Sequence, residues 1–259
     1  MPSRPFRIGL VTGVGEELDA FGVGFSRNVT DGVVTITRSE PTATTTAPST
    51  SDGPPDQTTA PVWWEAVGIC QGIGKVNAAV AATSLLLTHE VDMLAVVGTA
   101  GNIGGLPPGP YMLHEAVQAD YGARRSGGFV SYRAGTWPIG VPNQEPFRSD
   151  MAAALLAQEP SLPTARVATG DLFIEDTGHS KWLFETFGAG LVDMETAAVA
   201  QVAETHGVGW LAVKAASDDA NSDSADAFQT NLQLAATQAA ELLVALLDRL
   251  AQRSDTSAP

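Results

Sequence analysis

Short apolar runs alternate with alanine-rich segments along most of this 259-residue chain. Ile8–Val11 and Met93–Val97 are continuous apolar runs, a pattern typical of strands that are covered on both faces. Val76–Leu87 and Thr196–His206 are rich in alanine and favour helices, and Gly207 suits the residue that follows a helix end. Because strands alternate with helices, the sequence predicts a single α/β domain.

The same pattern predicts the other elements. We expect strands at Ala165–Thr169 and Trp210–Ala215, and helices at Ser149–Gln158, Lys181–Thr186 and Ala225–Gln252. Ligands of open α/β sheets bind at the carboxyl ends of the strands, so the segments that follow the strands are the candidates for a site. These segments are 12–17, 71–75, 98–105, 169–176, 192–196 and 217–221.

Residues 40–61 interrupt the alternation with threonine, proline, serine and alanine, and they contain no large apolar side chain. Such a tract buries too little surface to offset the entropy of ordering it, so we expect a mobile loop. Stretches typical of strands flank it, which predicts an insertion between neighbouring strands. The predicted domain spans residues 1–253, and residues 254–259 are expected to form a disordered tail.

The chain is acidic, with 29 Asp and Glu against 14 Lys and Arg and a formal charge of −15. Such a surface repels nucleic acids and anionic membranes and favours a small-molecule ligand. We find no signal peptide and no apolar run of about 18 residues, and we therefore predict a cytoplasmic protein. Cys70 is the single cysteine and the four histidines lack metal-ligand spacing, so we expect no metal and no cofactor.

The turn Thr12–Leu18 follows the first apolar run and has glycines where a helix N-terminus usually binds an anion. It nevertheless carries two carboxylates, Glu16 and Glu17, and its sixth position is leucine rather than the glycine of a dinucleotide-binding motif, which we exclude. The turn Gly72–Lys75 lacks the spacing and the Ser/Thr of a phosphate-binding loop. We interpret it as a tight strand-to-helix turn with a surface lysine.

Carboxylates also follow the later strands. Asp193 is suited to cap the helix that begins at Thr196. Glu195 precedes small residues, and a carboxylate there is able to accept two hydrogen bonds from a sugar diol. Asp218 directly follows the hydroxyl-bearing Ser217 at the end of an apolar strand. Among the local acids it is the best placed to face inward.

Five short motifs occur in order: Gly-Ile-Gly-Lys-Val at 72–76, Gly-Thr-Ala-Gly at 98–101, Thr-Gly-Asp-x-Phe-Ile at 169–174, Val-Asp-Met-Glu at 192–195 and Ala-x-Ser-Asp at 215–218. Together they resemble the nucleoside phosphorylase superfamily and, within it, the 5′-methylthioadenosine/S-adenosylhomocysteine nucleosidases. The resemblance implies a three-layer α/β/α fold with a central mixed, partly barrel-like sheet. It also implies a homodimer that hydrolyses the N9–C1′ bond of 5′-substituted adenosines to adenine and the substituted ribose.

The resemblance implies a role for each matching residue. Glu17 would activate the attacking water, and Asp218 would protonate N7 of the departing purine. Glu195 would hold the ribose hydroxyls. The other implied contacts are Met194 under the sugar, Phe173 stacked on the purine, the backbone of Ile174 at the purine edge, Thr99, Ala100 and Gly101 on the water and ribose side, Ser217 beside the acid, and Phe228 at the 5′ substituent. Protonating the base and orienting water suit a cleavage that passes through an oxocarbenium-like state.

Some segments differ from the family pattern, and alternatives stay open. Residues 120–124 and 137–140 do not match, and they would shape the pocket for the 5′ group. A futalosine or aminofutalosine hydrolase would place a basic residue such as Arg124 or Arg125 at that pocket. A phosphate-dependent purine nucleoside phosphorylase would need arginines around the attacking anion. A non-catalytic nucleoside-binding module would be expected to lack the two acid–base carboxylates.

Overall fold

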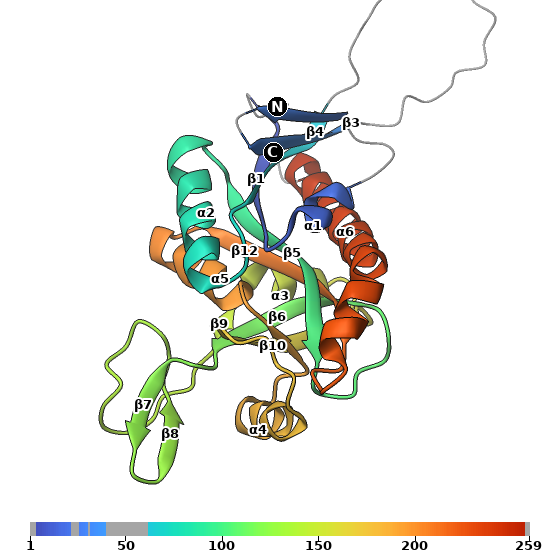
Figure 1. Ribbon diagram of the computed structural model, residues 1–259. Helices are drawn as coiled ribbons and strands as arrows, with labels where there is room; N and C mark the ends of the chain where they lie inside the picture. The colour runs from blue at the N-terminus through green and yellow to red at the C-terminus, as the bar shows by residue number, and fades with distance from the viewer. Residues whose placement is uncertain (1–3, 22–25, 31, 40–61, 257–259) are drawn as a thin grey trace, which may run out of the picture.

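The computed structural model describes residues 4–21, 26–30, 32–39 and 62–256. These residues form three layers, with a mixed sheet between two layers of helices (Figure 1). Helices α2 (Lys75–Thr88) and α5 (Thr196–His206) pack together on one face of the sheet. Helix α6 (Ser224–Thr256) covers the other face together with α1 (Gly15–Asp19). The predicted α/β/α class is therefore confirmed.

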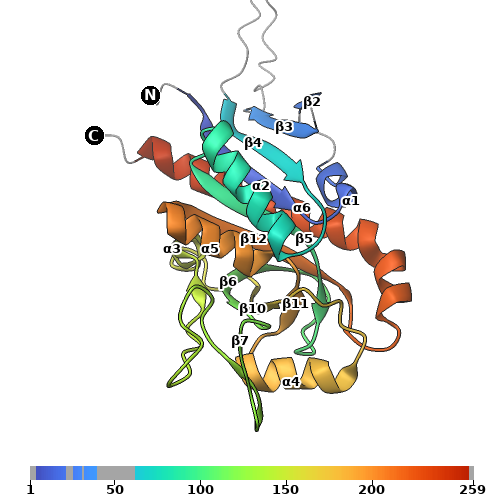
Figure 2. The ribbon, with the colours of Figure 1, turned by 60° about the vertical axis from the view of Figure 1, so that its left-hand side comes forward.

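The middle of the sheet is parallel. Strands β1 (Phe6–Thr12), β4 (Val62–Cys70), β5 (Met93–Asn102) and β12 (Gly209–Asp218) run in one direction, in the order β12-β5-β1-β4. Because their carboxyl ends meet at one edge, the loops that follow them are brought together. Figure 2 shows β1, β4 and β5 lying side by side beneath α2.

Beyond β12 the sheet turns back on itself. Strand β6 (Pro110–Gln118) is antiparallel to β12 and parallel to β10 (Thr164–Thr169), which pairs with β11 (Leu191–Asp193). Strand β11 then pairs with β5, through Leu191 opposite Asn102 and Val192 opposite Gly101. This closure makes the sheet partly barrel-like, as expected. The peripheral elements are β7 (Gly122–Arg125), β8 (Gly128–Ser131), β9 (Phe147–Arg148), α3 (Asp150–Leu156) and α4 (Thr177–Phe187).

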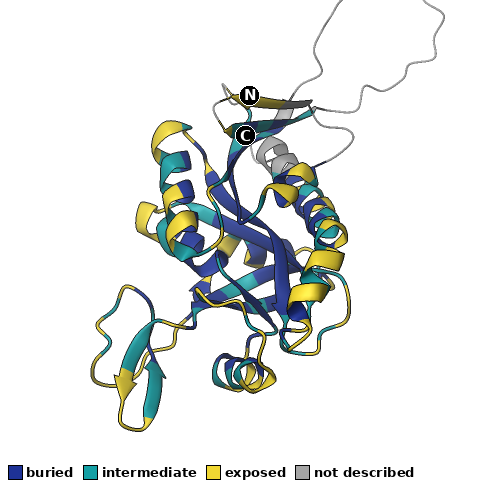
Figure 3. Ribbon diagram, in the orientation of Figure 1, coloured by how far each residue is buried: buried dark blue, intermediate teal, exposed yellow. Residues whose placement is uncertain are grey.

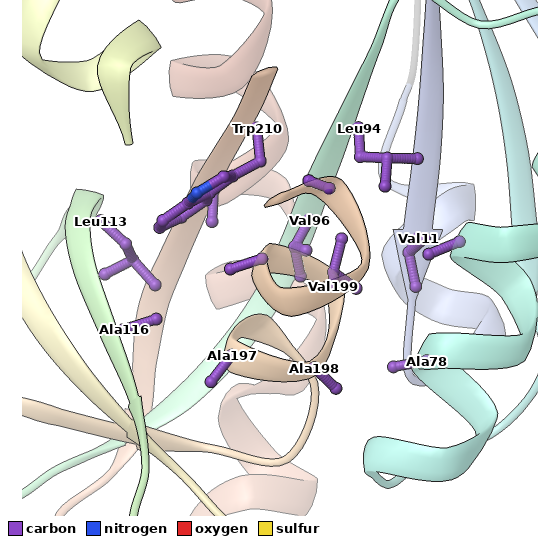
Figure 4. Packing of buried hydrophobic residues seen from close by; sticks show 14 of the residues in the cluster. Val11, Ala78, Leu94, Val96, Leu113, Ala116, Ala197, Ala198, Val199 and Trp210 are labelled. Atoms are coloured by element: carbon purple, nitrogen blue, oxygen red, sulfur yellow. The ribbon is translucent and has the colours of Figure 1, made fainter. Parts of the chain in front are cut away.

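The apolar runs are long because each central strand is buried on both faces. In β5, Leu94 and Val96 belong to the cluster formed with α2 and α5, whereas Ala95 and Val97 belong to the cluster formed with α6. Figure 4 shows the first cluster, where Leu94 and Val96 lie near Val199 of α5. Figure 3 shows the same burial across the strands, with exposed residues on the outer sides of the helices. The side chains alternate between the two cores, as a two-residue period requires.

Strands β5 and β12 extend further than the sequence predicted. Thr99 pairs with Ala215, and Ala100 pairs with Ala216, so the ladder continues through small residues that were expected to form loops. The register then shifts, and Asp218 lies opposite Gly101. The residues from Gly98 to Gly101 and from Ser217 to Asp218 are therefore held by the sheet rather than by free turns.

The helix expected at Lys181–Thr186 is also longer, because α4 begins at Thr177 and ends at Phe187, with a residue that signals each end. Asp176 caps it by accepting a hydrogen bond from the His179 N–H at 2.6 Å, and Gly188 ends it in the left-handed conformation with φ of 61°. Helix α5 has the predicted bounds, with Gly207 at its end. Helix α6 continues to Thr256, inside the segment expected to be a disordered tail.

The tract 40–61 lies outside the described residues, but the strands that flank it are β3 (Val33–Ser39) and β4. These two strands pair antiparallel, as does β2 (Ser26–Thr30) with β3. The two strands that flank the tract are therefore neighbours in the sheet, and the insertion itself stays a prediction. Within the described residues, no helix is both long and apolar enough to cross a membrane.

Candidate active site

A cavity of about 120 Å³ lies at the carboxyl ends of β1, β5 and β12. All eleven residues that the sequence analysis singled out line it, although they come from six separate stretches of the chain. The remaining lining residues are Gly13, Val14, Ile73, Leu172, Val192, Asp193 and Ala220. The folding of the sheet therefore brings the candidate residues into one place, whereas their individual roles stay predictions.

Glu17 occupies the floor of this cavity and is 3% exposed. Its Oε2 accepts hydrogen bonds from the N–H groups of Gly13 at 2.9 Å and Val14 at 3.2 Å. Its Oε1 accepts from the N–H of Thr99 at 2.9 Å, and the Thr99 hydroxyl lies 3.3 Å away. The amide groups that would form an anion site thus bind the protein's own carboxylate.

Gly98 makes room for that carboxylate. A Cβ atom at this position would lie 2.1 Å from Oε1 of Glu17, and the φ angle of Gly98 is 153°. No other residue fits there without moving Glu17, because both the space and the backbone conformation favour glycine. The glycine that precedes Thr99 is therefore part of the site's construction rather than a feature of a flexible turn.

Asp218 reaches the cavity from the last position of β12. Its Oδ2 accepts a hydrogen bond from the Ser217 hydroxyl at 2.9 Å, and its Oδ1 accepts from the Ala220 N–H at 2.9 Å. The register shift between Ala216 and Asp218 inserts an extra residue at the strand end, and such bulges redirect side chains. Asp219, in contrast, is exposed.

Glu195 is buried beside a lysine that the sequence analysis did not identify. The Nζ of Lys214 lies 3.1 Å from Oε2 of Glu195 and 3.3 Å from Oδ2 of Asp193, and its side chain is 1% exposed. Asp193 also accepts from the Thr196 N–H at 3.0 Å, which confirms its expected capping role. The sequence carried a signal for this pair, because Lys214 is a lone lysine inside the apolar run 210–216 and a buried ammonium requires a buried partner.

The buried charges around Lys214 do not balance. Burial raises the pKa of the Glu195 carboxyl more than the Lys214 ammonium lowers it, and the Asp193 and Glu17 carboxylates raise it further. Burial lowers the pKa of Lys214, but Glu195 and Asp193 outweigh this effect, and the net direction is upward. Burial is the largest cause of the raised pKa of Glu195, whereas the paired carboxylates of Glu195 and Asp193, together with Glu17, raise the pKa of Lys214. Lys214 therefore stays charged, whereas the Glu195 carboxyl binds a proton more readily than an exposed carboxyl does.

Aromatic side chains form the outer wall. The rings of Phe173 and Phe228 pack edge to face, with centroids 5.9 Å apart. Phe173 is 46% exposed, so its ring is available to a planar ligand. The backbone of Ile174 forms no hydrogen bond with other described residues although its side chain is partly buried. A ligand edge would satisfy these free amide and carbonyl groups.

The turn Gly72–Lys75 contributes more than expected. The interpretation as a tight turn is confirmed, with φ of 100° at Gly72 and 105° at Gly74. The interpretation of Lys75 as a surface lysine is wrong, because its side chain is 17% exposed and its Nζ lies 2.5 Å from Oδ1 of Asp120. The Gly74 N–H also donates to Oε1 of Glu195 at 3.3 Å. The turn is therefore joined to the cavity through the start of α2.

A larger cavity of about 450 Å³ adjoins the first and shares Leu172, Ile174, Val192 and Asp193 with it. Phe129, His179 and Trp182 give it an aromatic lining. Arg124 lines it, whereas the guanidinium of Arg125 points elsewhere, donating to the carbonyl of Gly140 at 3.0 Å. Within the described residues, no group of three or more His, Cys, Asp or Glu side chains is arranged to hold a metal ion.

Comparisons with known proteins agree with this geometry. Residues 58–248 match the family model of the Phosphorylase superfamily. The chain is 32% identical over 199 residues to a 5′-methylthioadenosine/S-adenosylhomocysteine nucleosidase of Geobacillus kaustophilus, covering 73% of this chain and 82% of that protein. It is also 32% identical over 190 residues to the nucleosidase of the same name from Haemophilus influenzae, covering 69% and 79%.

Solved structures share the fold at lower identity. The 5′-methylthioadenosine/S-adenosylhomocysteine nucleosidase of S. pneumoniae, in complex with a transition-state inhibitor, superposes with a TM-score of 0.72 at 23% identity over 94% of this chain and 99% of that one. The futalosine hydrolase of Helicobacter pylori superposes with a TM-score of 0.68 at 23% identity over 94% and 97%. The family model, the relatives and the shared fold agree. This chain therefore belongs to the phosphorylase superfamily.

Proposed function

We propose that the protein is a purine nucleoside N-glycosidase that hydrolyses the N9–C1′ bond of 5′-substituted adenosines. The observation that carries this proposal is the position of Glu17, whose carboxylate accepts hydrogen bonds from Gly13, Val14 and Thr99. A phosphate nucleophile would need those same amide groups, so the site is closed to it. A carboxylate at that position is instead able to orient a water molecule and accept its proton.

The other carboxylates fit the same reaction. Asp218 lines the same cavity from the end of β12 and would donate a proton to the departing base. Glu195 would accept hydrogen bonds from the ribose hydroxyls and, with Glu17, stabilise positive charge that develops on the sugar. Each acid–base contribution is worth roughly 10²–10⁴ in rate.

The charge of the cavity also disfavours a phosphorylase. Among the described residues that line it there are four carboxylates and no lysine or arginine. The buried cation Lys214 is already paired with Glu195 and Asp193. A phosphate ion would therefore meet repulsion without a partner.

The cavity that would hold the 5′ group of the substrate suggests a second candidate function. Arg124 lines the adjoining cavity beside aromatic side chains, and no described residue pairs with it. This arrangement suits a substituent with a carboxylate and an apolar stem, as in a futalosine or aminofutalosine hydrolase. The relatives at 32% identity favour the methylthioadenosine/adenosylhomocysteine type, which we propose as the first candidate.

We also propose a homodimer. The loop that follows β8 exposes three large apolar side chains within five residues, Trp137, Ile139 and Val141, at 81%, 65% and 88%. Apolar side chains exposed together at a loop tip are typical of an interaction surface. The location in the cytoplasm stays a prediction of the sequence.

A panel of adenosine, 5′-methylthioadenosine, S-adenosylhomocysteine, inosine and futalosine tests the proposal, each assayed with and without phosphate by mass spectrometry. We expect release of adenine and the free 5′-substituted ribose without phosphate. Glu17→Gln should lower kcat by about 10²–10⁴ while the circular dichroism spectrum is unchanged. Formation of a ribose 1-phosphate that depends on phosphate would contradict hydrolysis, and full activity of Glu17→Gln would remove its assigned role.

A further inference from the structure

The loop that carries Phe173 and Ile174 has few attachments of its own. Within the described residues, Leu172, Phe173, Ile174 and Glu175 make no hydrogen bonds, and Leu172 and Phe173 are 59% and 46% exposed. The chain is held on one side by the cap of α4 and on the other by Asp171. The position of Phe173 over the cavity therefore depends on how Asp171 is fixed.

Asp171 is fixed by two other segments of the chain. Its Oδ1 accepts a hydrogen bond from the Lys75 N–H at 2.8 Å, at the first residue of α2. Its own N–H donates to Oδ2 of Asp120 at 3.0 Å, just after β6. Lys75 completes the arrangement, because its Nζ lies 2.5 Å from Oδ1 of Asp120 and 3.8 Å from Oδ2 of Asp171. We call Lys75, Asp120 and Asp171 the clasp.

The clasp is partly shielded from water. The side chains of Lys75, Asp120 and Asp171 are 17%, 30% and 49% exposed. A carboxylate on the first N–H of a helix is favoured by the helix dipole, and an ion pair that shares members with hydrogen bonds is stronger than an isolated surface pair. The three residues therefore hold three chain segments together.

The clasp also reaches the ribose side of the cavity. Gly74, the residue before Lys75, donates its N–H to Oε1 of Glu195 at 3.3 Å. A single turn thus holds Asp171 through one amide group and Glu195 through the adjacent one. The distance between Phe173 and Glu195, which would set the spacing between base and sugar subsites, is fixed through this turn.

We propose that Lys75, Asp120 and Asp171 are positioning residues that preorganise the loop 171–174 for binding the nucleoside. This inference rests on the proposed function for the identity of the ligand. Without the clasp, substrate binding must order the loop, and the cost of that ordering reduces affinity. The acid–base carboxylates are untouched, so the chemical step should change little.

Lys75→Met is the direct test, and Lys181→Met is its matched control, because Lys181 lies on α4 with its side chain 72% exposed in a pair with Glu185. For Lys75→Met we expect KM for the best nucleoside of the panel to rise about tenfold while kcat stays within about threefold. Lys75→Arg should restore most of the affinity, and Asp120→Asn should repeat the loss. Equal changes in KM and kcat, or no change in KM, would overturn the proposal.

Hydrogen–deuterium exchange tests the clasp independently of activity. In the free protein, the Asp171 amide, whose N–H donates to Asp120, should exchange faster in Lys75→Met and Asp120→Asn than in the unaltered chain and in Lys181→Met, as read from overlapping peptides that cover residues 170–176. The exchange rates of peptides from β5 should be the same in all variants, which would show that the fold is intact. Identical exchange at 170–176 would contradict the clasp, whereas a lack of nucleoside hydrolysis by the unaltered protein would contradict only the proposed function.

Discussion

The Nζ atom of Lys214 lies 3.1 Å from Oε2 of Glu195, and both side chains are buried, at 1% and 6% exposure. Lys214 comes from the middle of β12 and Glu195 from the start of α5, so this pair joins the sheet to the helix that covers it. Asp193 shares the same ammonium at 3.3 Å. Glu195, for which we propose the ribose hydroxyls as ligands, is thus held at Oε2 by Lys214, and its Oε1 accepts a hydrogen bond from the Gly74 N–H at 3.3 Å.

Lys214→Met tests this pair. Removal of the ammonium leaves Asp193 and Glu195 buried without a cation, and we expect a loss of about 3–5 kcal/mol in the free energy of unfolding. A carboxyl whose pKa is raised in the folded state binds more protons there than in the unfolded state, so its contribution to stability is lost as the pH rises. The variant should therefore lose more stability at pH 8 than at pH 5, as measured by thermal unfolding. A loss that does not depend on pH would contradict the account.

Gly98→Ala tests the placement of Glu17. The added Cβ would lie 2.1 Å from Oε1 of Glu17, so the carboxylate must move away from the Thr99 amide. We expect turnover to fall by about 10²–10⁴, as for Glu17→Gln, and the double variant to be no worse than either single one. Gly127→Ala is the control, because a Cβ atom at Gly127 would have no other heavy atom within 4 Å. Full activity of Gly98→Ala would show that the carboxylate position is unimportant.

Asp218→Asn tests the proton donor. Asparagine preserves the shape and the contact with Ser217 but has no carboxyl proton to give, so we expect kcat to fall by about 10²–10⁴. Asp219→Asn is the matched control next in the chain, since Asp219 is exposed and lies outside the cavity lining. Kinetics of adenine release from 5′-methylthioadenosine measure both. Equal activity of the two variants would argue against the assignment of Asp218.

Glu115→Gln tests a structural ion pair away from the cavity. Burial tends to raise the pKa of Glu115, but the hydrogen bond from Arg166, with Nε at 2.7 Å, holds that pKa below its usual range. A lowered folded-state pKa contributes stability above the unfolded pKa, and this contribution is lost as the pH falls through the folded value. The variant should be less stable by about 1–2 kcal/mol at pH 7. The difference should shrink as the pH falls below the unfolded value of about 4.3 and vanish only below the lowered folded-state pKa.

Urea unfolding at pH 7 and at stepwise lower pH through the carboxyl titration range measures that difference. Glu185→Gln is the control, because Glu185 forms an exposed pair with Lys181 at 3.8 Å and such pairs contribute little. A Glu115→Gln variant as stable as the unaltered protein at pH 7 would show that solvent screens the pair with Arg166.

Much of the site could be predicted because local signals marked it. Gly207 at the end of α5, the small residues of 98–101 and the acids at strand ends each follow from local chemistry. The length of β5 and β12 could not be predicted from the chain alone. Ladder pairing between Thr99 and Ala215 depends on which strands meet, and the glycine and alanine residues beside them disfavour strands.

The contacts of Lys75 could not be predicted for a different reason. Its partners Asp120 and Asp171 are far away in sequence and follow strands that pair only after the sheet has formed. A lysine at the first position of a helix is most often solvated, so local reasoning favoured the surface. Strand β6 itself lies in a segment where motif resemblance is weak, and tertiary pairing rather than periodicity defines it.

Ser39 and Val62 are register partners at the ends of β3 and β4, so their Cα atoms lie about 5 Å apart across the ladder. Strand β4 then runs nine residues, about 30 Å, before the turn that holds Glu195 and Asp171. The junction between these strands is thus a natural place to open the chain. A circular permutant opened here, or a reporter domain inserted between Ser39 and Val62, would keep these two residues paired across the ladder. The nucleoside cavity would then lie at the far end of β4, away from the new ends or the inserted domain.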